Sequence, residues 1–181
     1  MATVLVPLAQ GCEELEAVTL IDLFRRAGVT VTVAGLEAGP VTASRGVVLL
    51  PETTLEAVLD QDFDLVVLPG GLGGAQRLEA DQRIAALLRR MTEQGRYVAA
   101  ICAAPKVLVS AGLVGGREVT AYPGVLDGQP DIKLSSAAVV RDGTFITSRG
   151  PGTAMDFALS LIEILCGPAK RNEVESALQR S

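Results

Sequence analysis

The sequence predicts an α/β fold in which a mostly parallel sheet is covered by helices on both faces. Short runs of β-branched residues alternate with stretches of helical periodicity along the chain. Two of these runs, at residues 64–68 and 97–101, are almost wholly apolar, which is typical of parallel strands buried on both faces. With 181 residues, 49% of them hydrophobic, the chain is expected to form one domain over residues 1–181.

The first half of the chain is predicted to follow the order strand, helix, strand, hairpin, strand, helix. In sequence these elements are residues 3–8, 14–27, 29–34, 41–50, 64–68 and 80–94. Gly28 and Gly95 directly follow the two helices and are expected to end them. The apolar stripe of the first helix is assigned to Leu15, Val18, Leu23 and Ala27.

The second half is predicted to continue with a strand at 97–101 and a helix that begins near Pro105. A short strand at 118–121 follows, and then a hairpin of residues 137–141 with 144–147. The hairpin turns at Asp142-Gly143, a dipeptide that favours tight turns. A helix at 153–165 and a short helix within 170–179 complete the chain.

The chain contains no histidine, which excludes Ser-His-Asp and Cys-His catalysis, metal ligation by histidine and the HExxH metalloprotease motif. Proton transfer must then use Asp, Glu, Lys, Tyr, Cys or water. The three cysteines form no CxxC pair, so neither a disulfide framework nor a zinc site is predicted. No metal and no cofactor are expected, because no metal-ligand pattern and no phosphate-binding loop is present.

Charge and hydropathy exclude two further classes of partner. The net charge is −5 and aromatic residues are only 3%, so no nucleic-acid partner is expected. No apolar run approaches the roughly 18 residues of a membrane span, and the N-terminus lacks the pattern of a signal peptide. We therefore expect a cytoplasmic protein without a membrane partner.

Cys102 is the first candidate for chemistry. In an open parallel sheet, ligands bind beyond the carboxyl ends of the strands, and Cys102 directly follows the strand at 97–101. The helix that begins near Pro105 would offer free N–H groups and a partial positive charge, which favour a nucleophilic thiolate of lowered pKa. The alternative is a small apolar residue of the core. Cys12 and Cys166 lack this setting and are interpreted as structural.

Glu16 is the candidate acid/base partner. Glu13 and Glu16 lie at the start of the first helix, where acidic residues commonly complement the helix dipole, and this explanation is sufficient for Glu13. Glu16 lies further along, where its side chain would point towards Cys102. In a chain without histidine, a partly desolvated glutamic acid is the expected proton donor and acceptor.

Gly70 and Gly71 follow the strand at 64–68 and have two interpretations. The pair either forms a simple turn or exposes N–H groups that, together with the amide of Ala103, hold a developing oxyanion. A nucleotide-binding P-loop does not fit, because no Gly-Lys-Ser/Thr follows.

Five segments occur in an order that covers essentially the whole chain: GCEELEAV, RRAG followed by VTVAGL, LPGG with GAQ, AAICAAP and TSRGPGT. Together they closely resemble the DJ-1/ThiJ/PfpI superfamily, specifically its parkinsonism-associated DJ-1 (protein deglycase) branch. The resemblance implies a flavodoxin-like three-layer sandwich, usually a homodimer, with a reactive cysteine on a strained strand-to-helix elbow. Cys102 would be that cysteine.

The same resemblance assigns roles to further residues. Glu16 matches the glutamate that contacts the cysteine, and Gly70, Gly71 and Ala103 match the positions whose amides donate to it. Arg25 and Arg26 are expected near the dimer contact, and Gly150 and Pro151 beside the site of the neighbouring subunit. The substrate pocket is expected to include Glu13, Arg26, Arg45, Tyr122, Gly150 and Pro151.

Two positions depart from the family pattern. Tyr122 stands where the DJ-1 branch often has a histidine, and Ala104 stands in place of the glycine of the familiar AICAGP. Any catalysis would therefore depend on Cys102 and Glu16, with Tyr122 as a hydrogen-bond donor or a wall of the pocket.

The resemblance implies a cofactor-free enzyme that acts on reactive α-oxoaldehydes or their protein adducts, as a glutathione-independent glyoxalase (glyoxalase III type) or a protein deglycase. The expected partners are a small aldehyde or a glycated protein, and a second copy of the chain. The alternative is a non-enzymatic sensor of oxidative stress, or a redox-regulated chaperone, that works through oxidation of Cys102. The peptidase activity of the PfpI branch is disfavoured, because no histidine can pair with the cysteine.

Overall fold

A seven-stranded sheet forms the centre of the computed structural model, which describes residues 1–180. Its strands are β1 (Thr3–Leu8), β2 (Thr30–Gly35), β5 (Thr53–Thr54), β6 (Leu65–Leu68), β7 (Tyr97–Ile101), β10 (Val139–Asp142) and β11 (Phe145–Ser148). They lie in the order β10-β11-β7-β6-β1-β2-β5, and every neighbouring pair is parallel except β10 with β11. The predicted fold class is confirmed.

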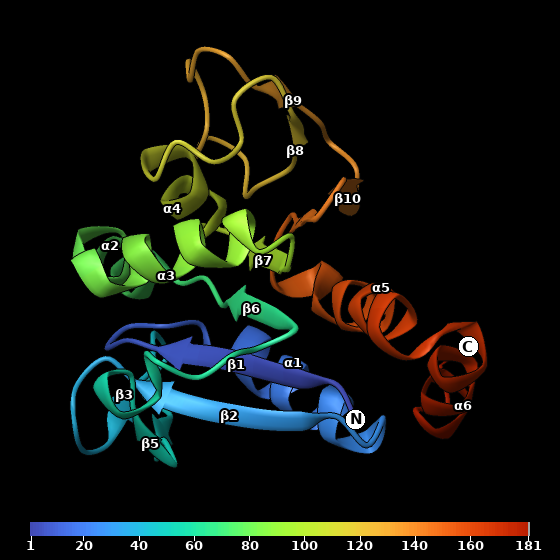
Figure 1. Ribbon diagram of the computed structural model, residues 1–181. Coiled ribbons are helices and arrows are strands. Elements are labelled where there is room, and N and C mark those ends of the chain that lie inside the picture. Colours follow the sequence, from blue (N-terminus) through green and yellow to red (C-terminus); the bar gives the residue numbers. More distant parts are fainter. Residues whose placement is uncertain (181) are drawn as a thin grey trace.

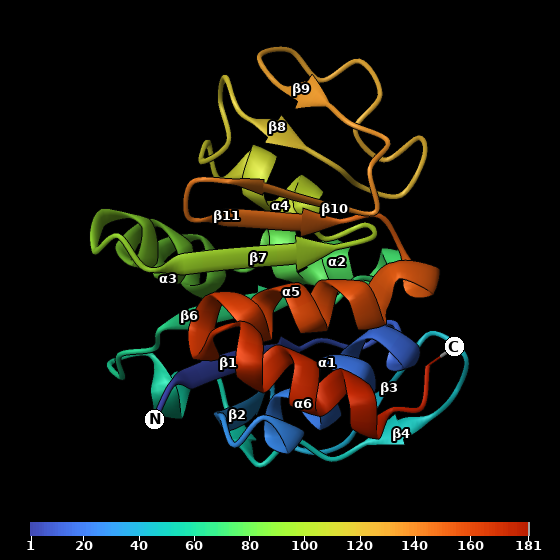
Figure 2. The ribbon, with the colours of Figure 1, turned by 90° about the vertical axis from the view of Figure 1, so that its right-hand side faces the viewer.

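Helices cover both faces of this sheet (Figure 1). They are α1 (Glu14–Arg26), α2 (Leu72–Ala80), α3 (Gln82–Glu93), α4 (Pro105–Ser110), α5 (Ala154–Cys166) and α6 (Pro168–Ala177). One apolar core joins the sheet to α1, α5 and α6, and the other joins it to α2, α3 and α4. Figure 2 shows α5 and α6 in front of the strands.

The strands supply both cores because successive side chains point to opposite faces. In β1, Val4 and Val6 belong to the core under α1, whereas Leu5 belongs to the core under α3. In β6, Val67 belongs to the core under α1 and Val66 to the core under α3. Burial on both faces explains why these strands are continuous apolar runs in the sequence.

Short elements complete the chain. Strands β3 (Val41–Thr42) and β4 (Val48–Leu49) pair antiparallel, which confirms the hairpin predicted at 41–50. Strands β8 (Glu118–Val119) and β9 (Lys133–Leu134) form a parallel pair, of which only the first was predicted. Two short 3-10 helices occupy Glu56–Val58 and Pro151–Thr153.

The segment before β7 differs from the prediction of a single helix at 80–94. The chain forms two helices, because Asp81 adopts an extended conformation and its carboxylate accepts a hydrogen bond from the Arg83 N–H at 2.8 Å, which caps α3. The preceding helix α2 contains Gly73 and Gly74, residues of low helix propensity, so propensity gave no signal for it. Tertiary packing of α2 on the sheet compensates for the low helix propensity of these two glycines.

The buried face of α1 also differs from the prediction. Leu15 and Val18 are 51% and 46% exposed, whereas Ala17, Leu20 and Phe24 are fully buried. Leu23 and Ala27 are buried as predicted, so the error is confined to the start of the helix, where the buried positions include the polar residues Glu14 and Glu16. Glu16 is buried because its side chain extends to the carboxyl end of the sheet, where it binds the Gly70 amide.

The carboxyl ends of three central strands meet at one edge of the sheet. Strand β6 lies between β1 and β7, so the segments that follow these strands, at 9–13, 69–71 and 102–104, are brought together. Among residues 1–180, no helix is both long enough and apolar enough to cross a membrane.

Candidate active site

Cys102 occupies a strained elbow between β7 and α4. Its φ of 65° lies in the left-handed region, which non-glycine residues rarely adopt. The backbone is held there at both ends: the Cys102 N–H donates to the Ser148 carbonyl at 3.0 Å, and the Cys102 carbonyl accepts from the Tyr122 N–H at 2.9 Å. Strain that the surroundings impose in this way is concentrated at functional sites.

Two backbone amides are directed at the thiol. The N–H groups of Gly71 and Ala103 hydrogen-bond to Cys102, whose residue surface is only 8% exposed. The amide of Gly70, which the resemblance grouped with these two, instead donates to Glu16 Oε2 at 2.7 Å. Two of the three amides therefore face the sulfur, and the third positions the carboxyl group beside it.

Glu16 is fully buried and lies against Cys102. One turn into α1, its side chain crosses to the end of β6, where Gly70 binds Oε2. Among residues 1–180, Glu16 Oε1 has no hydrogen-bond partner that meets ordinary geometric limits. A buried carboxyl group with one free oxygen is poised to hold or release a proton at that atom.

Burial raises the pKa of Glu16 to about 7, and the hydrogen bond from Gly70 and the proximity of the Cys102 thiol act in the opposite direction. A carboxyl group buried away from water favours its neutral form, because the charged form loses its hydration. A pKa near neutrality suits a group that must both donate and accept protons.

Burial likewise raises the pKa of the Cys102 thiol to about 12, with an added contribution from the negative charge of Glu16. The sequence led us to expect a lowered pKa, and the direction is the opposite. Helix α4 begins only at Pro105 and spans six residues, so its N-terminus stabilises a thiolate at Cys102 less than expected. The two neighbouring acids are coupled: they share one negative charge near neutral pH, and a second charge is strongly disfavoured.

The raised pKa of Glu16 predicts a pH dependence of stability. Since the pKa of Glu16 is about 7 when folded and 4.5 in the reference state, its stabilising contribution is complete below pH 4.5 and is lost as the pH rises towards 7. The loss should be roughly 3 kcal/mol in the free energy of unfolding. Denaturant unfolding of wild type and Glu16→Gln between these pH values measures it. An equal pH dependence in the two proteins would contradict the raised pKa.

The glycines beside the thiol are required by space. A Cβ on Gly70 would lie 2.7 Å from both Cys102 Cβ and Glu16 Oε2. A Cβ on Gly71, whose φ is 83°, would lie 2.6 Å from the Glu13 amide nitrogen. Any side chain at these positions would separate the amides and the carboxyl group from the sulfur.

Glu13 and Arg45 lie at the rim of this region. The Glu13 N–H donates to the Gly70 carbonyl at 2.9 Å, and its carboxylate accepts from the Ser44 hydroxyl at 2.8 Å. The Arg45 N–H donates to Glu14 Oε1 at 2.8 Å, which holds the β3–β4 turn against the start of α1. The structure thus brings the backbone of Arg45 close to the site.

Tyr122 and Gly150 lie on the opposite side of the elbow. The Tyr122 amide binds Cys102, and its ring packs on Gly150, where an added Cβ would be 3.3 Å from Cδ2. Tyr122 also lines a cleft of about 340 Å³. Pro151, the next residue after Gly150, begins the 3-10 helix that precedes α5.

Arg26 is not brought to the pocket. It lies ten residues after Glu16, about 15 Å along α1, and its Nε pairs with Asp22 at 2.7 Å. Arg25, at the same end of α1, pairs with Glu52 at 2.6 Å. Because Glu16 at the start of α1 contacts Cys102, an arginine at the other end of the same helix cannot line the pocket of its own chain.

Ser148 and Thr153 are positioning residues that the sequence analysis missed. The Ser148 carbonyl binds the Cys102 amide, while the Ser148 hydroxyl donates to the Ala138 carbonyl at 2.8 Å and lies 2.7 Å from the Thr153 hydroxyl. Both residues belong to the TSRGPGT segment, of which only Gly150 and Pro151 were singled out. They fix the end of β11 against the elbow.

The chain is similar to known proteins over almost its whole length. Residues 2–164 match the DJ-1/PfpI family model. Protein dj-1beta of Drosophila melanogaster is 46% identical over 180 residues, which cover 96% of this chain and 95% of that protein. The glutathione-independent glyoxalase DJR-1.2 of Caenorhabditis elegans is 36% identical over 175 residues, which cover 96% and 92%. The crystal structure of Drosophila melanogaster DJ-1beta matches with a TM-score of 0.96 and 44% identity, covering 99% of this chain and 98% of that one.

Proposed function

The chain belongs to the DJ-1/PfpI family, and on this premise we propose that it is a cofactor-free enzyme that converts reactive α-oxoaldehydes to hydroxy acids at Cys102. The observation that carries the proposal is the buried pair of Cys102 and Glu16, which shares one proton beside the amides of Gly71 and Ala103. The relative named as a glutathione-independent glyoxalase supports this reaction class.

The first step is the addition of sulfur to the aldehyde. The single negative charge of the pair resides on Glu16, whose pKa is the lower of the two, and its carboxylate takes the thiol proton as the Cys102 sulfur attacks the aldehyde carbon of methylglyoxal. The carbonyl oxygen becomes an alkoxide near the amides of Gly71 and Ala103 and takes the proton of Glu16. The product is a neutral hemithioacetal beside an ionised Glu16.

The second step moves a hydrogen between the two carbons. The Glu16 carboxylate removes the C1 proton and delivers it to the C2 oxygen, which gives an enediol; it then removes the C1 hydroxyl proton and delivers it to C2. C1 is thereby oxidised to a thioester while C2 is reduced to a secondary alcohol, so no external oxidant or reductant is needed. Water then cleaves the thioester to release lactate and regenerate the Cys102 thiol. Hydrolysis of protein adducts of the aldehyde, the deglycase reaction, would use the same pair.

The experiment that tests this function is an assay of purified protein with methylglyoxal in the absence of glutathione. Formation of lactate above the protein-free rate supports the proposal. Consumption of the aldehyde without lactate would contradict it, because that result describes simple trapping by protein nucleophiles.

Oxidation of Cys102 is the second candidate function. A sulfinate there would accept hydrogen bonds from Gly71 and Ala103, whereas Cys12 has no surface exposed to an oxidant. We expect mild peroxide to add oxygen atoms to Cys102 before Cys12 and the exposed Cys166, as measured by mass spectrometry of peptides. Earlier modification of either other cysteine would contradict a sensor role. Oxidation of Cys102 without turnover by the unmodified protein would favour the sensor over the enzyme.

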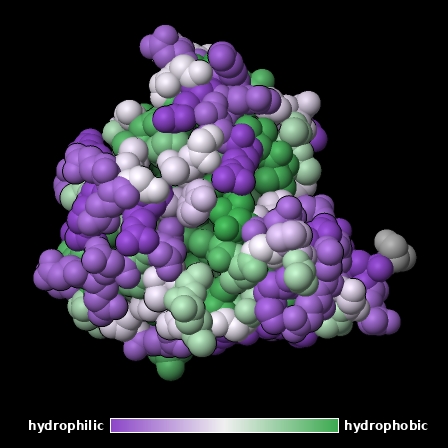
Figure 3. Space-filling view, turned by 45° about the vertical axis from the view of Figure 1, so that its right-hand side comes forward, coloured by the Kyte–Doolittle hydropathy of each residue, from purple (hydrophilic) through white to green (hydrophobic). Residues whose placement is uncertain are grey.

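We also propose a homodimer. Apolar side chains are exposed on α1 and on the adjoining hairpin: Leu15, Val18, Val47 and Val48. A separate strip of apolar side chains lies between hydrophilic surfaces on the face drawn in Figure 3. Since association buries exposed apolar surface, sedimentation at micromolar concentration should show a dimer, and Val18→Glu should shift it to monomer. Leu134→Glu, at an exposed apolar residue on β9, is the control. A wild-type monomer would contradict the proposal.

A further inference from the structure

A second cavity, of about 370 Å³, opens at the carboxyl ends of β1 and β2. This edge of an open α/β sheet is where such folds bind ligands, and the volume falls in the range of small-molecule sites. Cys102, Glu16 and Gly71 are not among its lining residues. The cavity is therefore a separate place from the site of the proposed reaction.

The floor of the cavity consists of buried apolar side chains. It is formed by Leu8, the last residue of β1, by Leu36, which follows β2, and by Val41 at the start of β3. These three residues are 1%, 8% and 3% exposed, so the surrounding protein fixes their positions. Ala80, at the end of α2, lines one wall and leaves room because of its short side chain.

A cation without a neutralising partner lies on another wall. Arg77 Nη1 donates to the carbonyls of Gln10 and Gly73, at 3.2 and 3.1 Å, and these bonds orient the guanidinium. Within the described residues 1–180, no carboxylate forms an ion pair with Arg77. Its remaining N–H groups are free to bind an anion, and the planar guanidinium suits a carboxylate.

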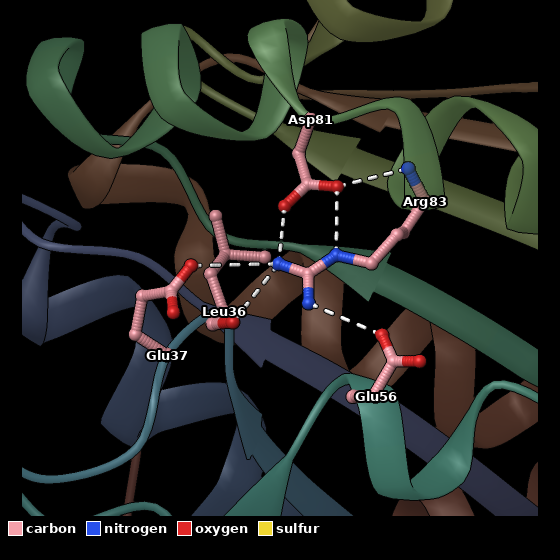
Figure 4. Close-up of polar contacts among 5 residues, drawn as sticks. All are labelled: Leu36, Glu37, Glu56, Asp81 and Arg83. Atoms are coloured by element: carbon pink, nitrogen blue, oxygen red, sulfur yellow. Dashed lines mark hydrogen bonds and ion pairs between the residues drawn. The ribbon is translucent and has the colours of Figure 1, made fainter.

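Negative charge also lines the cavity, at Asp81 and Glu37, and part of it is paired with Arg83. Arg83 forms a two-pronged pair with Asp81, at 3.1 and 2.7 Å, and lies 3.6 Å from Glu37, as Figure 4 shows. The same guanidinium donates to the Leu36 carbonyl at 3.0 Å, so it braces the cavity floor. Because Asp81 and Glu37 would repel a strongly charged anion, a monoanion fits better than a phosphate dianion.

We propose that this cavity binds a small monocarboxylic acid with a short apolar chain. Its carboxylate pairs with Arg77, and its chain lies on Leu8, Leu36 and Val41. The apolar floor and the single free cation select for this class, because the chain is removed from water while the charge finds one partner. The site is independent of the proposed reaction at Cys102.

Titration of the isotopically labelled full chain by amide NMR tests the proposal, with isovalerate as the probe. Isoamyl alcohol, which lacks the charge, and acetate, which lacks the chain, are the matched comparisons. We expect saturable shifts at Leu36, Gly73 and Ala80, with a Kd of roughly 1 mM, as befits so small a ligand. Each comparison compound should bind at least about tenfold more weakly.

Variants at exposed positions test separately the role of the Arg77 charge and the role of the cavity space beside Ala80. Arg77→Gln should weaken isovalerate binding at least about tenfold, and Ala80→Phe should abolish it by filling the cavity. Arg89→Gln, an exposed arginine on α3 outside the cavity, is the control and should bind as wild type does. No saturable shift, unchanged affinity in Arg77→Gln, or equal binding of isoamyl alcohol would each overturn the proposal.

Discussion

Replacing Cys102 by serine is expected to lower the turnover of methylglyoxal by at least about 1,000-fold. The serine hydroxyl fits the same elbow, but its proton is far too weakly acidic to share with Glu16, so no nucleophile forms. Steady-state lactate production measures the effect. The matched control is Cys166→Ser, which changes an exposed cysteine at the end of α5 and should retain the wild-type rate.

Full activity in Cys102→Ser would overturn the entire site. A merely unfolded variant is distinguished by its thermal unfolding, which should remain cooperative because serine preserves the two backbone hydrogen bonds of the elbow. Loss of activity in Cys166→Ser would show that the essential thiol had been assigned wrongly.

Replacing Glu16 by glutamine should lower turnover by roughly 100-fold, the usual scale for the loss of a general acid/base. Glutamine can still accept from Gly70 and donate to sulfur, but it cannot carry the C1 proton. It also removes the negative charge that raises the pKa of Cys102, so the thiol should ionise at lower pH than in the wild type. Thiolate absorbance against pH and lactate production measure the two effects separately.

Glu16→Leu separates charge from hydrogen bonding. Leucine leaves the buried Gly70 amide unpaired and offers no donor to sulfur, so this variant should lose turnover and also about 1–3 kcal/mol of stability. A fully active Glu16→Gln would contradict the proposed proton transfer, even if Cys102 proved essential.

The sequence predicted where the candidate site lies in the fold, because this location depends on local signals. Buried parallel strands appear as apolar runs, and residues after such strands meet at one edge, so Cys102, Glu16 and the Gly70-Gly71 pair were identified from position. The hairpin at 41–50 was predicted with soft boundaries, and the structure contains it because it depends on its own turn.

Features that depend on tertiary contacts were not predictable. Gly70 binds Glu16 rather than the thiol because α1 carries the carboxylate across to β6, which no spacing in the sequence reveals. The same crossing buries Glu16 and exposes Leu15. The pKa of Cys102 followed burial and charge coupling instead of the helix start, because these effects require knowledge of what surrounds the sulfur.

Lactate formed from methylglyoxal in heavy water tests the central claim most directly, because it reports both turnover and the route of the proton. The Cys102–Glu16 mechanism predicts that purified protein, without glutathione or added cofactor, produces lactate that carries deuterium at C2, since the proton held by Glu16 exchanges with solvent. No lactate above the protein-free rate, or lactate with only protium at C2, would contradict the account.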